Sequence, residues 1–221
     1  MKKLLLFSFS IFTLSCHSQV PKGFTYLATI DTTIQSELRY ISPNNFIGKP
    51  IDGYLRDTVI VSTPTAKALK EVQSKLSEFG LSLKVFDAYR PQQSVDHFVR
   101  WAKILNDTVM KNKYYPHVAK KDLFKLDYIA AKSGHTRGST VDLTIVDLKT
   151  GKELDMGSSY DFFGTPSHPF YPKLTKEQRS NRVLLRTLML EAGFKPYAKE
   201  WWHFTLKKEP FPKTYFNFPV K

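Results

Sequence analysis

Three stretches of the chain carry apolar residues at helical spacing. The first is predicted to be a helix capped by Thr63, with an apolar face of Leu69, Val72, Leu76 and Phe79. The second would start at Pro91, with an apolar face of Val95, Phe98, Val99 and Ala102. The third would lie between Thr175, as its cap, and Gly193, with the apolar residues Val183, Leu184, Leu185, Leu188 and Met189.

Other stretches alternate apolar and polar residues, as half-buried strands do. This pattern occurs at 32–40, 81–86, 139–145 and 201–208. Within 139–145, one face would carry Val141, Leu143 and Ile145, and the other Thr140, Asp142 and Thr144. A Lys-Thr-Gly turn in 147–155 predicts a hairpin after that strand, and 156–172 has a loop composition. This order predicts an α+β fold: a small, mostly antiparallel sheet with packed helices in a single domain.

The N-terminus has the pattern of an export signal. Basic residues after Met1 precede an apolar run that is too short to span a bilayer, and Cys16 follows at once. Residues 1–16 are therefore predicted to be a signal peptide, either of the lipoprotein type ending before Cys16 or of the ordinary secretory type. We expect an exported, periplasmic protein, anchored to the membrane by lipid if Cys16 is acylated, with its folded domain at 20–221.

The composition is that of an ordinary globular domain, with 42% hydrophobic and 24% charged residues. The net charge is +13, but the lysines are spread along the chain without an arginine-rich arm or a nucleic-acid motif. We therefore expect no nucleic-acid partner. Because the chain has one cysteine, a metal site would have to use histidine and carboxylate ligands.

Two segments carry residues that suit such a site. His135 and Asp142 lie seven residues apart in SGHTRGSTVDLTI, and Gly138 between them allows a turn that brings the histidine beside the strand. Glu200 and His203 lie three residues apart in EWWHF. Two histidines and one carboxylate are a common ligand set for catalytic zinc. A structural histidine, a solvated Asp142 and a surface Glu200 would explain the same residues.

Glu200 would point away from His203 if both were in a regular strand. The two side chains can act at one centre only if Glu200 lies in a loop or bulge before the strand. Trp201 and Trp202 would then shield the carboxylate and raise its pKa, as a general base working near neutral pH requires.

These segments resemble the D-alanyl-D-alanine dipeptidases, zinc peptidases of the vancomycin-resistance type. The resemblance extends over most of the chain and includes ELRYISPNNFIG, FDAYRPQQS, MGSSYDFFG, NRVLLRTLMLEAGF and EPFPKTYFNFPVK. It implies one Zn²⁺ bound by His135, Asp142 and His203. It also implies hydrolysis of D-Ala-D-Ala by a metal-activated water, with Glu200 as the general base.

The resemblance implies roles for four further residues. Arg90 would stabilise the negative oxygen of the tetrahedral intermediate, as a permanently charged arginine can. Asp161 would bind the free ammonium of the dipeptide, Ser133 would add a hydrogen bond there, and Tyr40 would line the same site. Thr140 stands where the family commonly has alanine.

Two other functions stay open on the sequence. One is a D,D-carboxypeptidase or endopeptidase that acts on peptidoglycan stem peptides. The other is a zinc-binding cell-wall module without activity, against which the presence of both Glu200 and Arg90 argues. The sequence leaves the oligomeric state open.

Overall fold

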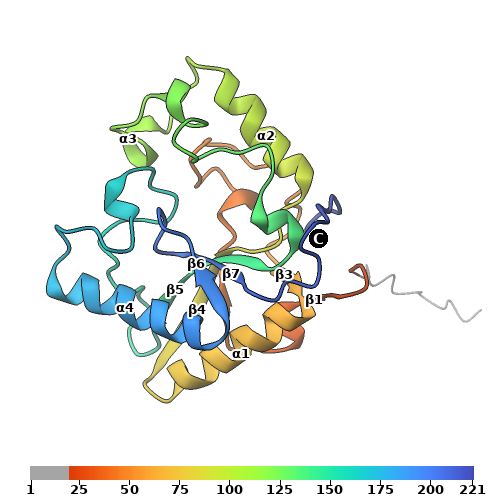
Figure 1. Cartoon of the computed structure of the whole chain (residues 1–221), viewed down its shortest axis with the longest axis vertical. Coiled ribbons are helices and arrows are strands. Elements are labelled where there is room, and N and C mark those ends of the chain that lie inside the picture. The colour runs from red at the N-terminus through yellow and green to blue at the C-terminus, as the bar shows by residue number, and fades with distance from the viewer. Residues whose placement is uncertain (1–19) are drawn as a thin grey trace, which may run out of the picture.

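The computed structural model describes residues 20–221, so the predicted signal peptide at 1–16 and its Cys16 lie outside the described range. At the centre is a five-stranded sheet with strand order β2-β4-β5-β7-β6 (Figure 1). Its strands are β2 (Gln35–Ser36), β4 (Leu81–Asp87), β5 (Thr140–Asp147), β6 (Phe194–Pro196) and β7 (His203–Leu206). A smaller sheet pairs β1 (Phe24–Tyr26) with β3 (Ile60–Ser62). Only β2 and β4 pair in parallel among these strands, so the predicted α+β fold with a mostly antiparallel sheet is confirmed.

Helices cover both faces of the sheet. The helices are α1 (Thr63–Ser77), α2 (Gln92–Lys103), α3 (Lys111–Tyr114) and α4 (Lys176–Glu191). Short 3-10 turns are η1 (Leu27–Thr29), η2 (Arg39–Ile41), η3 (Lys120–Asp122), η4 (Gly134–Arg137) and η5 (Thr165–Ser167). α1 and α4 pack together on one side of the sheet, and α2 and α3 form a lobe with long loops on the other (Figure 1). Within the described residues, no helix has the length and apolar character needed to cross a bilayer.

The first two predicted helices are present, with differences at their ends. α1 begins at Thr63 itself, and its N-cap is Ser62, so the prediction of Thr63 as the cap is wrong by one residue. The helix ends at Ser77, which places Phe79 beyond it and leaves that side chain 76% exposed instead of facing the core. Pro91 is the N-cap of α2 rather than its first residue.

The third predicted helix is confirmed together with its cap. The Thr175 hydroxyl accepts a hydrogen bond from the Gln178 backbone, and the Gln178 side chain accepts one from the Thr175 backbone, which is a capping box. Leu185 and Met189 are fully buried, whereas Val183 is 48% exposed and does not belong to the apolar face.

The strands differ from their predictions mainly in length. The stretch 32–40 forms only the short β2 before η2 begins, and the last strand starts at His203 rather than at 201. The predicted hairpin is a turn closed by one bridge between Val146 and Glu153.

Both faces of β5 are buried, including the face predicted to be polar. Thr140 and Thr144 have no exposed surface, and Asp142 is 2% exposed. The Thr140 hydroxyl is satisfied by that of Thr205 on the neighbouring strand, at 2.9 Å. The interpretation of Asp142 as part of a solvated strand face is therefore wrong.

Candidate metal centre

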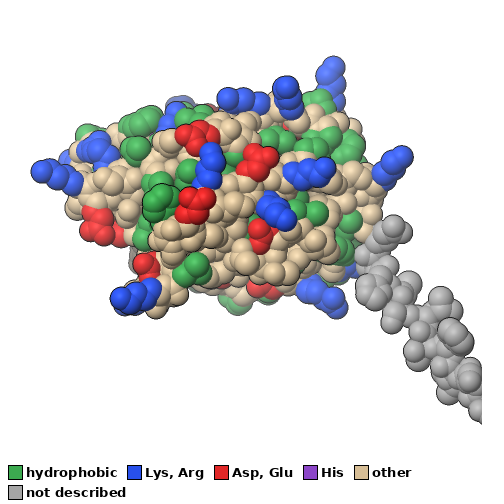
Figure 2. Space-filling view, turned by 90° about the horizontal axis from the view of Figure 1, so that it is seen from below, with side chains coloured by type: hydrophobic (Ala, Val, Ile, Leu, Met, Phe, Trp, Pro, Cys, Tyr) green, Lys and Arg blue, Asp and Glu red, His purple; other side chains and the backbone are tan. Residues whose placement is uncertain are grey.

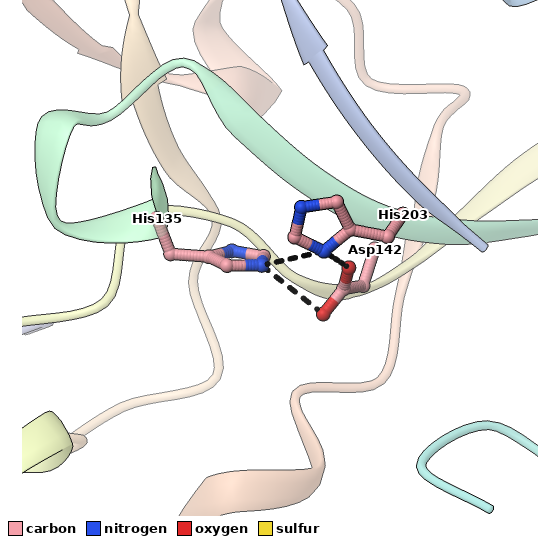
Figure 3. Close-up of side chains that lie close together, drawn as sticks. All are labelled: His135, Asp142 and His203. Carbon is pink, nitrogen blue, oxygen red and sulfur yellow. Dashed lines mark hydrogen bonds and ion pairs between the residues drawn. The ribbon is translucent and has the colours of Figure 1, made fainter. Parts of the chain in front are cut away.

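The pairing of β5 with β7 brings Asp142 and His203 together. The two residues are direct partners in the antiparallel register, so their side chains leave the sheet on the same face. His203 Nδ1 lies 3.0 Å from Asp142 Oδ1 (Figure 3).

His135 reaches the same point from η4, just ahead of β5. Gly138 ends η4 with a φ of 78°, and this left-handed conformation makes the tight turn that the sequence predicted. The Nε2 atom of His135 lies 3.3 Å from Asp142 Oδ2 and 3.4 Å from His203 Nδ1 (Figure 3). One ligand atom from each of the three residues lies within 4.8 Å of the others, so the two segments meet as expected for one metal ion.

The chemistry of this cluster fits a cation. His135 Nδ1 lies 2.8 Å from the carbonyl oxygen of Ala88, and the tautomer that donates there directs the Nε2 lone pair into the cluster. Asp142 Oδ1 is buried, and the ring nitrogen that it faces at 3.0 Å, His203 Nδ1, is itself a candidate ligand atom. Lone pairs that face one another in this way favour a positive ion between them, and two imidazoles with one carboxylate form a donor set that Zn²⁺ accepts.

Glu200 lies in a turn before β7, as the argument from strand geometry required. Its Oε2 is 3.4 Å from His203 Nδ1. Burial raises the pKa of Glu200 to about 7, although His203 acts in the opposite direction. Trp201 and Trp202 follow Glu200 in this turn and are 5% and 1% exposed, so their buried rings anchor the segment that presents the carboxylate.

Arg90 faces the cluster from the segment after β4. Its Nε and Nη2 atoms lie 2.9 and 2.8 Å from Asp87 Oδ2. The guanidinium carbon is 5.2 Å from the centre of the Tyr40 ring and 5.1 Å from that of Phe98, and Nη2 is 3.7 Å from Asp142 Oδ2. The guanidinium is therefore held in one orientation beside the candidate metal ligands.

A cleft of about 410 Å³ opens over these groups. Its lining residues include the sequence-predicted Arg90, Ser133, His135, Asp142, Glu200 and His203. Tyr128 and Tyr197 form part of its wall. Ser133 also accepts a hydrogen bond from the backbone of His135, at 3.3 Å. The volume suits a small molecule of dipeptide size.

Tyr40 and Asp161 lie next to the cluster rather than in the lining of this cleft. Asp161 is 6% exposed and has a φ of 61°, and its Oδ2 accepts a hydrogen bond of 2.9 Å from the Tyr40 hydroxyl. Burial, with Asp142 acting in the same direction, raises the pKa of Asp161 well above its ordinary value. The Tyr160 hydroxyl lies 3.1 Å from that of Tyr40 and 3.3 Å from Asp142 Oδ2, so hydroxyls link the two carboxylates.

Sequence reasoning missed Asp87, Tyr54 and Tyr160. Asp87 stands three residues before Arg90 at the end of a predicted strand, which was the one signal available for it. Tyr54 falls in a Gly- and Pro-containing loop, and Tyr160 in another loop, so no periodic pattern marked either residue.

An α+β domain with two histidines and an aspartate around one point, and with a buried carboxylate and an arginine beside them in a cleft, has the layout of a metal-dependent hydrolase. Comparison with known proteins is more specific. The profile of the family described as D-ala-D-ala dipeptidase matches residues 21–221, so the chain belongs to this peptidase family.

Curated relatives align with the chain over most of their own length. The chain is 40% identical over 198 residues to the D-alanyl-D-alanine dipeptidase of Enterococcus faecalis, covering 90% of this chain and 98% of the relative. It is 39% identical over 197 residues to that of Streptomyces coelicolor, covering 89% of this chain and 98% of the relative. It is 32% identical over 180 residues to that of Escherichia coli, covering 81% and 82%.

Proposed function

We propose that this protein is a zinc-dependent dipeptidase that hydrolyses D-Ala-D-Ala. The observation that carries the proposal is the convergence of His135, Asp142 and His203 within 4.8 Å, with Glu200 Oε2 3.4 Å from His203. The substrate is proposed from the family, since relatives that align over nearly their whole length are named D-alanyl-D-alanine dipeptidases.

The three converging residues would hold the ion. Zn²⁺ bound there would supply Lewis-acid chemistry, which can polarise a peptide carbonyl and activate water. His135 is oriented for this role by the Ala88 carbonyl oxygen, 2.8 Å from its other ring nitrogen. Asp142 contributes the negative charge, and contact with both histidines outweighs its burial and holds its pKa well below the usual range.

Glu200 would move the proton. With a pKa of about 7, its carboxylate can take a proton from the attacking water and its acid form can return that proton to the leaving amine. Because Glu200 lines the cleft, its carboxyl group would have access to both the attacking water and the leaving amine.

Arg90 would stabilise the negative charge that develops on the carbonyl oxygen of the substrate. Its guanidinium lines the cleft and stays charged throughout the reaction. Because Asp87 and two aromatic rings already fix its orientation, little reorganisation accompanies the chemical step.

Asp161, Ser133 and Tyr40 would recognise the free ammonium of the dipeptide. A cation that arrives beside Asp161 favours the ionised form of its carboxyl group. Ser133 is in the cleft wall, whereas Tyr40 donates to Asp161, and these two lie beside the metal cluster outside that wall. This arrangement would select short substrates with a free amine.

Hydrolysis of free D-Ala-D-Ala by the purified mature chain tests the proposal. We expect turnover that a chelator abolishes and that added Zn²⁺ restores. N-acetyl-D-Ala-D-Ala is the matched comparison: preference for the acylated substrate would favour a D,D-carboxypeptidase instead. Bound zinc without turnover of either substrate would favour a cell-wall module without activity.

We also propose that the protein is exported and carries lipid on Cys16, on the strength of the N-terminal pattern alone. Metabolic labelling with a fatty acid should mark the wild-type protein in the membrane fraction and leave a Cys16→Ser variant unlabelled. Equal labelling of both would contradict the lipid anchor.

A further inference from the structure

Asp87 has a central position, of which the mechanism above uses only the contact with Arg90. It ends β4 and has no exposed surface. Val85 is paired with Leu143 and Asp87 with Asp142, so β4 has one residue more than β5 between these pairs. This β-bulge brings Asp87 opposite the candidate metal ligand Asp142.

Three side chains converge on the Asp87 carboxylate. Arg90 donates to Oδ2 through Nε and Nη2, at 2.9 and 2.8 Å. The hydroxyl of Tyr54 donates to Oδ1 at 2.5 Å. His135 Nδ1 lies 3.4 Å from Oδ2, beside its contact with the Ala88 carbonyl oxygen. A buried carboxylate with both oxygens engaged holds its partners in fixed directions.

The backbone joins the same groups. The amide of Arg90 donates to the carbonyl oxygen of His135, at 3.3 Å. Asp87 is not among the residues that line the cleft. It can therefore influence a reaction in the cleft only through the groups that it holds.

We infer that Asp87 is a positioning residue that fixes Arg90 and His135 together, with Tyr54 as its third support. The consequence for Arg90 rests on the proposed function, whereas the consequence for His135 concerns metal binding alone. Arg90 would meet the substrate oxygen, and His135 would bind the ion. Because both contact the Asp87 carboxylate, they keep a constant separation.

The variant Asp87→Asn tests this role with almost no change in volume. It keeps one acceptor oxygen but turns an amide donor towards groups that are themselves donors. We expect kcat on D-Ala-D-Ala to fall about 10–100-fold, and the dissociation constant for Zn²⁺ to rise by a similar factor. KM should change by less than about threefold, because Asp87 does not touch the substrate. Zinc affinity is measured by competition with a chromogenic chelator.

A double-mutant cycle separates positioning from a general structural effect. In an Arg90→Ala background and at saturating Zn²⁺, Asp87→Asn should reduce kcat by no more than about threefold, because the residue through which it acts is absent. It should still weaken zinc binding in that background. Losses of kcat that multiply in the double variant would overturn the inference for Arg90.

Tyr54→Phe is the gentler variant if Asp87→Asn does not fold. Loss of one hydrogen bond to the carboxylate should lower kcat roughly 3–10-fold. The matched control is Tyr89→Phe, since Tyr89 is also a buried tyrosine but donates to the Phe218 carbonyl oxygen at 2.9 Å. Wild-type kcat and zinc affinity in both Asp87→Asn and Tyr54→Phe would refute the inference. A wild-type protein without dipeptidase activity would instead refute the proposed function and leave the zinc measurement decisive for His135.

Discussion

Two buried carboxylates in the candidate centre have opposite shifts of pKa. For Asp142, burial acts to raise the pKa, but His135 and His203 outweigh it and the carboxylate stays ionised. For Glu200, burial is dominant and the pKa rises to about 7. Acidic groups whose surroundings separate their pKa values in this way suit different roles, here the proposed roles of metal ligand and proton carrier.

The role of Glu200 predicts a specific defect in Glu200→Gln. The substitution keeps the shape of the side chain but removes its capacity to take a proton, so we expect kcat to fall on the order of 10³–10⁴-fold. Zinc content after dialysis should equal that of the wild type, because the three ligands are intact. The exposed Glu177 provides the control variant Glu177→Gln. Turnover near the wild-type rate would exclude Glu200 as the base.

Arg90 supports a second prediction at the scale of one residue. Removing one donor to a developing oxyanion typically costs about 10²–10³ in kcat, and we expect this loss for Arg90→Ala. Arg90→Lys should recover only part of the rate, since lysine cannot reproduce the planar pair of bonds to Asp87. Steady-state kinetics measure both variants, with Arg56→Ala as an exposed control. A change confined to KM would contradict the role.

At the scale of the elements, the sequence predicted well those features that depend only on neighbouring residues. The cap at Thr175 and the turn at Gly138 are of this kind, since each depends on a few neighbouring residues. Phe79 and Val183 were predicted wrongly, because an apolar residue at helical spacing can lie past a helix end or at the edge of its buried face. The alternative that Asp142 lies on a solvated strand face was wrong, because periodicity carries no information about what covers a strand.

The sequence predicted the residues of the candidate centre but not the residues that hold them in position. His135, Asp142, Glu200 and His203 come together as the two motifs suggested. Asp87 could not be assigned in the same way, because its place opposite Asp142 depends on a bulge that shifts the pairing of β4 with β5. Long-range register of this kind leaves little trace in a single sequence.

At the scale of an element, loss of the capping box of α4 should lower the stability of the protein without changing its activity. Thr175→Ala removes the acceptor for the Gln178 backbone and should lower the free energy of unfolding by about 1 kcal/mol. Denaturant unfolding measures this change, and Thr108→Ala at an exposed position is the control. Because α4 packs on β6 and contributes no residue to the lining of the cleft, kcat should stay unchanged. A parallel loss of kcat would show that α4 supports the centre directly.

At the scale of the whole molecule, the candidate ligands, Glu200 and Arg90 gather at one cleft, while charged side chains are spread over the face seen in Figure 2. The chain has a net charge of +13, yet on the face in Figure 2 basic and acidic side chains are interspersed and the basic ones form no continuous patch. The cleft itself is lined by both signs of charge, with Arg90 and Lys132 beside Asp142 and Glu200.

The ion should also stabilise the whole molecule, because its ligands come from η4, β5 and β7. An ion that binds the folded state at 100 times its dissociation constant adds about 2.7 kcal/mol, which raises Tm by roughly 5–10 °C for a domain of this size. We expect calorimetry of the metal-free protein with added Zn²⁺ to show this rise, and Asp142→Asn to lose it. His97→Ala tests the pair that the half-buried His97 forms with the exposed Asp52, and it should keep the rise. A rise that survives Asp142→Asn but disappears in His97→Ala would place the ion at that surface pair instead of between His135 and His203.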